Sequence, residues 1–185
     1  MYHIKNDKRA QASSELICAG LLACMKEKPF ARITITDVQR ASTVSRSTFY
    51  RNFDCLEDVL ALLCDRGFQA VFTEYNALPP AQRGSLAKAV FQYWFRNSAV
   101  LEALVQIHQT DILFDSLRRS SGLIEALQPM ADDPARFDYF VAIITSSMIG
   151  VLTVWVEHGK TETENQMVQK LTNAFIEMAI LELPG

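Results

Sequence analysis

Hydrogen-bond donors are concentrated in one short stretch of the sequence, residues 45–52. The guanidinium of Arg46 can donate two hydrogen bonds to the O6 and N7 atoms of guanine. Short hydroxyl groups beside it suit phosphate oxygens, which receive most of the contacts that position a protein on DNA. Taken singly, Arg46 and Arg51 are better explained by a solvated helix face. The residues with donor chemistry are Ser45, Arg46, Ser47, Thr48, Tyr50, Arg51 and Asn52.

Two short helices are expected to position these donors. Thr34 is a candidate N-cap with Asp37 at the third helical position, which predicts a helix over 35–41. After a short break, Ser45 can cap a second helix over 46–52. This spacing is typical of a helix-turn-helix, whose second helix presents its N-terminal residues to the major groove of DNA.

The same region carries a recognisable motif. It runs from Ile33-Thr34-Ile35-Thr36-Asp37-Val38 to Val44-Ser45-Arg46-Ser47-Thr48-Phe49-Tyr50-Arg51-Asn52-Phe53. The motif resembles the DNA-binding domain of the TetR family of bacterial transcriptional regulators, over about residues 10–65. The resemblance implies that Thr34, Thr48 and Tyr50 contact phosphates. It also implies that Thr36 and Ser47 occupy positions that contact bases in relatives. Phe49 and Phe53 are expected in the core.

The motif departs from the family pattern at three positions. Thr43 stands where the turn usually has glycine, and a β-branched residue tolerates positive φ poorly. Asn52 replaces the usual histidine, and Leu56 replaces a common lysine at the start of the next helix. The loss of that lysine predicts weaker or less salt-dependent binding to DNA.

Charge is divided unevenly along the chain. The net charge is −3, but residues 1–53 hold nine basic and four acidic side chains, a net charge of +5. The rest of the chain holds nine basic and seventeen acidic side chains, a net charge of −8. A basic module joined to an acidic body fits DNA binding by the N-terminal part.

Helical periodicity runs through the whole chain, and no strand pattern is convincing. We therefore expect an all-α fold of about nine helices. The resemblance to the TetR family implies an N-terminal three-helix DNA-binding domain and a C-terminal helical ligand-binding and dimerisation domain. The expected divisions are 1–53 for the helix-turn-helix domain, 54–76 for a connecting helix and 77–185 for the effector and dimerisation domain. Helices are predicted over 8–27, 35–41, 46–52, 55–75, 85–96, 98–108, 111–120, 123–128, 134–158 and 164–181.

An uncharged run from Tyr139 to Val156 is long enough for a membrane span, but polar residues interrupt it and neither flank is rich in lysine or arginine. A helix buried between its own domain and a partner explains the run better. The segment that follows, Trp155-Val156-Glu157-His158-Gly159, is similar to a TetR-family pattern before the last helix, which implies a four-helix dimer interface. Candidates for this interface are Ile149, Leu152, Trp155, Leu171, Phe175 and Met178.

Aromatic residues are frequent in the C-terminal part. In the TetR family this part often holds a small-molecule pocket, which would suit an apolar or aromatic effector here. The alternative is that these residues form an ordinary core. The pocket candidates are Phe91, Trp94, Phe95, His108, Phe114, Phe140 and Met148.

We expect a cytoplasmic homodimeric regulator, most simply a repressor, which binds a palindromic DNA operator and responds to an effector. No secretory segment precedes the chain's first helix, and its four cysteines are expected to be reduced. No catalytic motif, cofactor site or metal-ligand spacing is present in the sequence. Two alternatives remain open: the same fold regulated by a protein partner, and a small all-α enzyme or ligand carrier.

Overall fold

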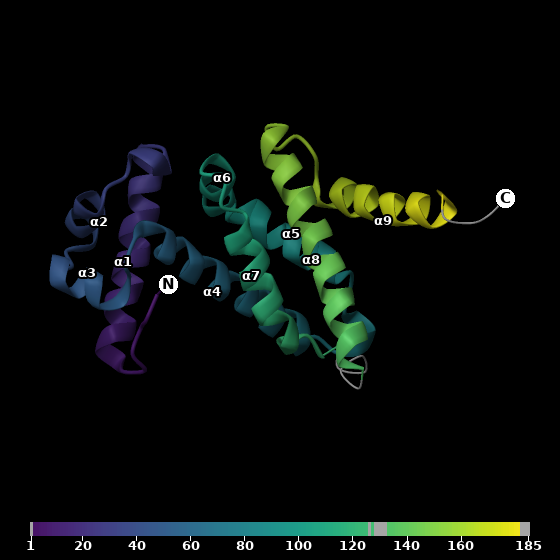
Figure 1. Ribbon diagram of the computed structural model, residues 1–185, viewed down its shortest axis with the longest axis horizontal. Helices are drawn as coiled ribbons and strands as arrows, with labels where there is room; N and C mark the ends of the chain where they lie inside the picture. Colours follow the sequence, from purple (N-terminus) through teal and green to yellow (C-terminus); the bar gives the residue numbers. More distant parts are fainter. Residues whose placement is uncertain (1, 126, 128–132, 182–185) are drawn as a thin grey trace.

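The chain folds into packed α-helices. The structure is a computed structural model that describes residues 2–125, 127 and 133–181, and within these residues it contains nine α-helices and no strand. The predicted all-α fold class is therefore confirmed. Figure 1 shows α1–α3 gathered at one end, α4 running from them into the body, and α9 standing away from the body at the other end.

The N-terminal unit consists of three helices around a small apolar core. Its elements are α1 (Lys8–Glu27), the 3-10 turn η1 (Phe30–Arg32), α2 (Ile35–Ser42) and α3 (Arg46–Asn52). Ile17, Leu21, Val38, Phe49 and Phe53 are fully buried between these helices.

Gly20 allows α1 and α2 to lie unusually close together. A Cβ atom at Gly20 would lie 2.8 Å from the Cβ atom of Ser42, 3.0 Å from the amide nitrogen of Ser42 and 3.1 Å from the carbonyl oxygen of Val38. Any residue with a Cβ atom at this position would push the two helices apart. This contact therefore fixes the position of the helix-turn-helix along α1.

Helix α4 (Leu56–Ala77) joins the two halves of the molecule. Its first turns bury Val59 and Leu60 against the N-terminal unit, and its later turns bury Phe68 and Phe72 in the body. Phe68 packs edge-on against Trp94 of the body, with ring centroids 5.3 Å apart. The connecting helix is thus a rigid part of both cores.

The remaining helices form the body. They are α5 (Leu86–Arg96), α6 (Ser98–Gln106), α7 (Asp111–Ser120), α8 (Pro134–Glu157) and α9 (Glu164–Leu181), with 3-10 turns η2 (Pro80–Gln82) and η3 (Ser121–Leu123). Asp133 caps α8 by accepting a hydrogen bond from the amide of Arg136, and Thr163 and Gln166 cap α9 reciprocally.

Two predicted helices differ from the observed ones. The helix predicted over 98–108 ends at Gln106, because His108 adopts a left-handed backbone with φ 56°. The α-helix predicted over 123–128 is wrong for its described residues, since a 3-10 turn occupies Ser121–Leu123 and Ile124 is extended. Residues 126 and 128 lie outside the described part of the chain.

All four cysteines are free thiols, and Cys18, Cys24 and Cys64 are buried. Burial raises the pKa of Cys18 to about 11. These thiols are packing residues in a helical core.

Candidate nucleic-acid interface

The helix-turn-helix is built by local capping. The side chain of Thr34 accepts a hydrogen bond from the amide of Asp37 at 3.2 Å, and Asp37 Oδ2 accepts from the amide and the hydroxyl of Thr34 at 2.8 and 2.7 Å. Asp37 also pairs with Lys28 Nζ at 2.7 Å. The hydrogen bonds from Lys28 and Thr34 hold the pKa of Asp37 well below its usual range. Thr34 therefore uses both of its donors to start α2.

In the turn between the two helices, Thr43 has a left-handed backbone conformation. Thr43 has φ 57° and ψ 16°, the conformation that glycine adopts most readily. Ser45 then caps α3, with its Oγ atom 3.3 Å from the amide nitrogen of Thr48 and 2.9 Å from the Thr48 hydroxyl. The departure from glycine at Thr43 leaves the turn geometry intact and places a β-branched residue in a strained region.

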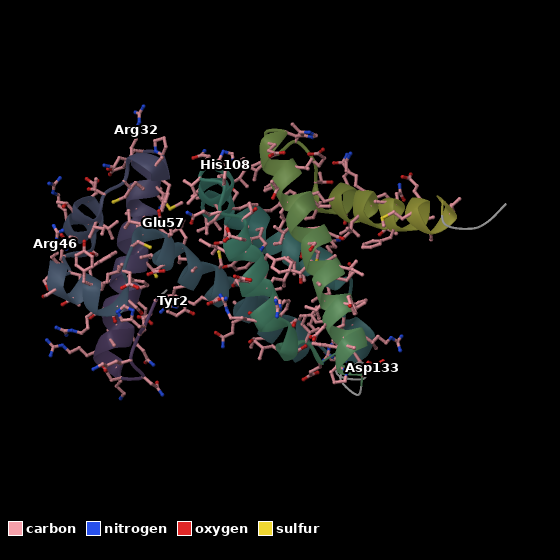
Figure 2. All side chains as sticks on the ribbon, viewed as in Figure 1. Tyr2, Arg32, Arg46, Glu57, His108 and Asp133 are labelled. Atoms are coloured by element: carbon pink, nitrogen blue, oxygen red, sulfur yellow. The ribbon has the colours of Figure 1, made fainter. Side chains whose placement is uncertain are left out.

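The exposed face of α3 carries most of the predicted donors. Arg46, Ser47, Tyr50 and Arg51 are exposed, and Thr48 is half-buried. The guanidinium of Arg46 lies over the ring of Tyr50, 5.5 Å from its centroid, and its Nη2 atom donates to the Tyr50 hydroxyl at 3.4 Å. Figure 2 shows Arg46 at the end of the molecule farthest from α9. On α2, Thr36 is exposed as well.

Asn52 lies on the buried side of α3. Its side chain is only 1% exposed, and its Nδ2 atom donates to the carbonyl oxygen of Thr48 at 2.8 Å. Position 52 lies beside Phe49 and Phe53 on the inner face of α3 and also borders the groove at the end of this helix, so a DNA contact for Asn52 stays a prediction. Its amide satisfies a backbone carbonyl inside the unit.

The N-terminal arm (residues 2–6) extends the basic surface. The amide of His3 donates to the carbonyl oxygen of Asn52 at 3.0 Å, which lays the arm along the end of α3. A polar groove of about 290 Å³ results. Its polar lining residues are Lys5, Asp7, Arg9, Ser13, Thr48, Arg51 and Asn52, so three cations and one carboxylate face it. The sequence pattern does not single out Lys5 and Arg9, although their charge contributes to the basic N-terminal segment.

The C-terminal half contains an apolar cavity of about 230 Å³ between α4, α5, α7 and α8. Phe140 and Met148, two of the predicted pocket residues, line this cavity. The other predicted pocket residues lie elsewhere. Phe91 and Trp94 are buried in the solid core, Phe95 stacks on Trp155, His108 lies in a turn and Phe114 is half-buried on α7.

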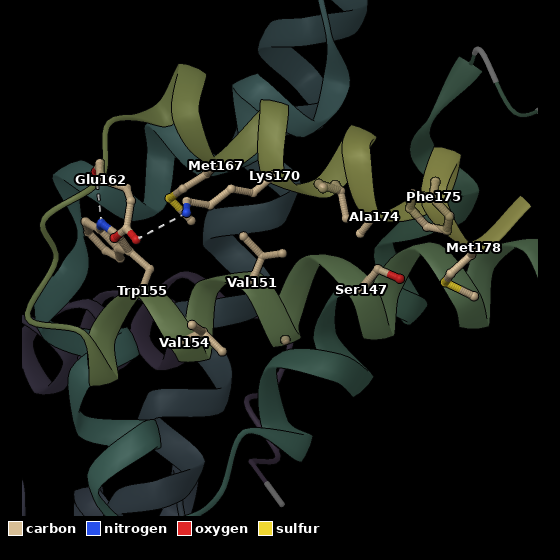
Figure 3. A pocket seen from close by; sticks show the side chains of 12 residues that line it. Ser147, Val151, Val154, Trp155, Glu162, Met167, Lys170, Ala174, Phe175 and Met178 are labelled. Atoms are coloured by element: carbon tan, nitrogen blue, oxygen red, sulfur yellow. Dashed lines mark hydrogen bonds and ion pairs between the residues drawn. The ribbon is translucent and has the colours of Figure 1, made fainter. Parts of the chain in front are cut away.

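Helices α8 and α9 enclose a second apolar groove of about 380 Å³, which Figure 3 shows from close by. Leu171, Phe175 and Met178, three predicted interface residues on α9, line it. The side chain of Trp155 closes one end, where its Nε1 atom donates to the carbonyl oxygen of Glu162 at 3.1 Å.

The predicted interface residues on α8 lie in the chain's own core. Leu152 is 0% exposed, and Ile149 and Trp155 are also buried. The prediction of a partner contact is wrong for these three, because other parts of the same chain already cover them. The exposed stripe of α8 is formed instead by Tyr139, Ile143, Ser146, Gly150 and Val154, spaced three or four residues apart.

The long apolar helix meets one test for a membrane segment. Among the described residues, α8 is the one helix long and apolar enough to cross a membrane, judged by length and composition alone. One such helix is weak evidence, because core helices of water-soluble proteins meet the same test.

Comparisons with known proteins agree with this architecture. Residues 85–177 match a TetR-type family model described as "Transcriptional regulator C-terminal region". Lin0861 from Listeria innocua has a similar structure, with a TM-score of 0.74 at 16% identity over 95% of this chain and 96% of that chain. A TetR transcriptional regulator from Streptococcus agalactiae gives 0.59 at 18% identity over 91% and 96%. No curated protein matches the sequence. At these identities the structural likeness concerns the fold alone.

Proposed function

The chain belongs to the TetR family of transcriptional regulators, and we propose that it is a cytoplasmic, homodimeric repressor that binds a palindromic DNA operator through α2 and α3. The observation that carries this proposal is the exposed N-terminal end of α3, where Arg46 and Ser47 are both exposed. Figure 2 shows Arg46 at the end of the molecule. A recognition helix enters the major groove by this end.

Arg46 is the residue proposed to read a base. Its guanidinium makes a long hydrogen bond to the Tyr50 hydroxyl and stacks on the Tyr50 ring. Both contacts can persist while the other guanidinium donors reach guanine O6 and N7. Tyr50 would thus hold the guanidinium extended and reduce the side-chain entropy lost on binding.

Phosphate binding is proposed for the basic rim around α3. Arg51, Lys5 and Arg9 line the groove between the N-terminal arm and the recognition helix, and these three cations outnumber the single carboxylate there, Asp7. Thr48 lies beside them. Ser47 is exposed next to Thr48 and shares this surface. Leu56 is buried, so the phosphate contact that a lysine makes at this position in relatives has no counterpart here.

Dimerisation is proposed through the exposed stripe of α8 together with α9. Ile143 is 54% exposed and Val154 is 45% exposed, while Ile176 and Met178 of α9 are exposed as well. A Cβ atom added at Gly150 would meet no atom within 4 Å, so a second helix can approach closely there. A partner covering this surface also accounts for the apolar character of α8. Two-fold pairing would place the recognition helices for half-sites about 34–36 Å apart.

The proposed division of labour follows the helices. Residues 1–53 bind DNA, residues 54–76 connect, and residues 77–185 dimerise and accept an effector. Because α4 is part of both cores, a change in the body that tilts α4 changes the spacing of the two recognition helices. Coupling of this kind is typically worth about 1–3 kcal/mol in binding free energy. No catalytic activity is proposed.

The test is selection of binding sites from random duplex DNA, followed by gel-shift titration at several salt concentrations. We expect enrichment of one palindromic sequence, and we expect Arg46→Ala to relax the preference at one base pair at a cost of about 1–3 kcal/mol. Failure to enrich any sequence at low salt would contradict the proposal. Circular dichroism of Arg46→Ala provides the folding control, since Arg46 is exposed.

A further inference from the structure

No charged side chain is found among the described residues that line the cavity in the body. Its walls come from α4, α5, α7, α8 and the turn after α7, and most of its lining residues are aliphatic or aromatic, including Phe72, Val90, Leu117, Phe140 and Met148. Of the lining residues within the described part of the chain, Ser121 and Thr145 are the polar ones. A charged group placed here would lose its hydration without gaining an ionic partner, which is strongly unfavourable. The lining therefore selects neutral molecules.

Thr145 supplies an unused hydrogen-bonding group in this apolar wall. Its side chain is 2% exposed, and its hydroxyl forms no hydrogen bond with any residue in the described part of the chain. The described side-chain atoms that are fully buried without a partner are Gln39 Nε2 and Trp94 Nε1. The Thr145 hydroxyl is not among them, because Thr145 lines the cavity and its hydroxyl can be reached from there. Most polar groups inside proteins are paired, so a ligand in the cavity can supply the missing partner. The neighbouring Thr153 on the same helix shows the usual arrangement, because its hydroxyl donates to the carbonyl oxygen of Ile149 at 2.9 Å.

Ser121 offers a second, weaker polar contact. Its hydroxyl donates to the carbonyl oxygen of Arg118 at 2.7 Å, so its donor is occupied and its oxygen can only accept. The hydroxyl of Thr145 can donate or accept. A ligand with one hydroxyl or carbonyl group would satisfy Thr145, and a hydroxyl could also donate to Ser121.

The size of the cavity limits the apolar part of such a ligand. Its volume is about 230 Å³. An apolar cavity of roughly 150 Å³ holds a benzene molecule, and pockets for drug-sized ligands begin near 300 Å³. The cavity is thus matched to a compact molecule with one ring or a short branched chain.

We infer that this cavity binds a small neutral compound with one apolar ring-sized body and one hydroxyl or carbonyl group, and that Thr145 recognises the polar group. The inference rests on the proposed regulatory function and deepens it, since it names the chemical class of the effector. Binding would be felt by α7, because Leu117 and Ser121 line the cavity while Ser116 and Arg119 on the same segment of chain bond to Asp65 of α4.

Isothermal titration calorimetry of the full chain with three probes tests the inference. The probes are 4-ethylphenol, ethylbenzene and 4-ethylbenzoate, which share a ring and differ in their polar group. We expect 4-ethylphenol to bind about three- to tenfold more tightly than ethylbenzene, the factor that one neutral hydrogen bond supplies. We expect no detectable binding of 4-ethylbenzoate. Equal or tighter binding of the carboxylate, or no binding of either neutral probe, would overturn the inference.

Variants of matched shape assign the hydrogen bond. Thr145→Val removes the hydroxyl and keeps the branching, so it should abolish the preference for 4-ethylphenol over ethylbenzene while ethylbenzene still binds. Thr153→Val, whose hydroxyl bonds within the helix, should leave the preference unchanged. A preference that survives Thr145→Val assigns recognition to another group and refutes this one.

The same measurements separate the effector class from the regulatory function. Operator binding in the gel shift without any binding of neutral probes would refute the ligand class and leave the DNA-binding function standing. Probe binding with the expected preference, in a protein that enriches no DNA sequence, would support the site and refute the regulator.

Discussion

The hydroxyl of Tyr2 donates a hydrogen bond to Oδ2 of Asp65 at 2.5 Å, across 63 positions of sequence. The other carboxylate oxygen of Asp65 accepts from the hydroxyl of Ser116 at 2.5 Å and from the guanidinium of Arg119 at 2.8 Å. One carboxylate on α4 therefore ties the N-terminal arm to α7. The body and the DNA-binding unit share this joint in addition to their apolar contacts.

The hydrogen bonds around Asp65 are connected to the recognition helix through His3. Next to Tyr2, the amide of His3 donates to the carbonyl oxygen of Asn52, the last residue of α3. A displacement of α7 would pull on Asp65, and through Tyr2 on the arm that lies against α3. This arrangement supplies a polar route from the cavity to the DNA-binding surface.

We predict that Tyr2→Phe weakens this joint. Losing a hydrogen bond to a charged group costs about 1.5–3 kcal/mol when buried, and Tyr2 is half-buried, so we expect a loss of about 1 kcal/mol in the free energy of unfolding. Burial and the Asp65 carboxylate raise the pKa of Tyr2 from 10.0 to about 12. The resulting stabilisation is complete below pH 10 and is lost as the pH rises through 12.

Denaturant unfolding between neutral pH and about pH 11 measures both effects. The wild type should lose stability above pH 10 more steeply than Tyr2→Phe does, because the unfolded state releases the Tyr2 proton first. Tyr139→Phe is the control, since Tyr139 is 74% exposed. Parallel pH profiles for the wild type and Tyr2→Phe would show that the hydrogen bond to Asp65 contributes nothing.

Thr43→Gly should stabilise the protein. A left-handed conformation costs a residue with a Cβ atom roughly 1–2 kcal/mol, and the greater freedom of glycine in the unfolded state offsets about 0.5–1 kcal/mol of that. We expect a net gain near 0.5–1 kcal/mol, or about 2 °C in Tm for a chain of this size. Ala41→Gly, in the neighbouring helix, should be destabilising instead. A lower Tm for Thr43→Gly would mean that the threonine has a compensating contact.

Gly20→Ala should be destabilising. The new methyl group would meet the backbone of α2 at 3.0 and 3.1 Å, and backbone atoms cannot move aside as a flexible side chain can. Overpacking of this kind costs about 1–3 kcal/mol. Gly84→Ala is the matched control, because no atom lies within 4 Å of its Cβ position. Thermal unfolding of both variants measures the effect on Tm. An unchanged Tm for Gly20→Ala would show that the α1–α2 contact is loose.

The N-terminal helices could be predicted from the sequence because their ends depend on neighbouring residues. Thr34 with Asp37 and Ser45 with Thr48 are capping contacts over three positions, so a sequence pattern is enough to place them. The burial of Asn52 could not be predicted in this way, because it depends on packing and not on neighbouring residues in the sequence. An amide beside two exposed donors resembles a third donor, and only its place between the Phe49 and Phe53 faces distinguishes it.

The buried and exposed faces of α8 could not be separated from the sequence. Almost every residue between Tyr139 and Val156 is apolar or small, so no contrast in polarity marks the side that faces the core. The sequence therefore favours a partner surface for Ile149 and Leu152, although both pack inward. The Tyr2–Asp65 bond is likewise beyond sequence reasoning, because it depends on how distant helices pack.

The pair Arg51 and Asn52 separates DNA binding from folding. Arg51 is exposed beside the arm groove, so Arg51→Ala should leave stability unchanged, weaken all DNA sequences alike and lower the salt slope of binding by about one. Asn52→Ala removes a buried hydrogen bond to the Thr48 carbonyl and should cost about 1–3 kcal/mol of stability. Salt-dependent gel shifts and denaturant titrations of both variants test this. An Asn52→Ala protein of normal stability with lost DNA binding would place Asn52 in the interface.

Ile143→Asp should dissociate the proposed dimer and leave the fold of each subunit intact. Ile143 is 54% exposed within one chain, so the carboxylate remains hydrated in the monomer, whereas pairing through α8 would bury two such charges without cationic partners. Leu16→Asp on α1 is the control, because Leu16 is similarly exposed (51%) and lies on the DNA-binding unit. Sedimentation equilibrium should show a monomer for Ile143→Asp and a dimer for Leu16→Asp, with unchanged circular dichroism for both. A dimeric Ile143→Asp protein would place the interface on another surface. If the wild type bound a single half-site as tightly as the full operator, the proposal that the dimer spaces two recognition helices for two half-sites would be contradicted.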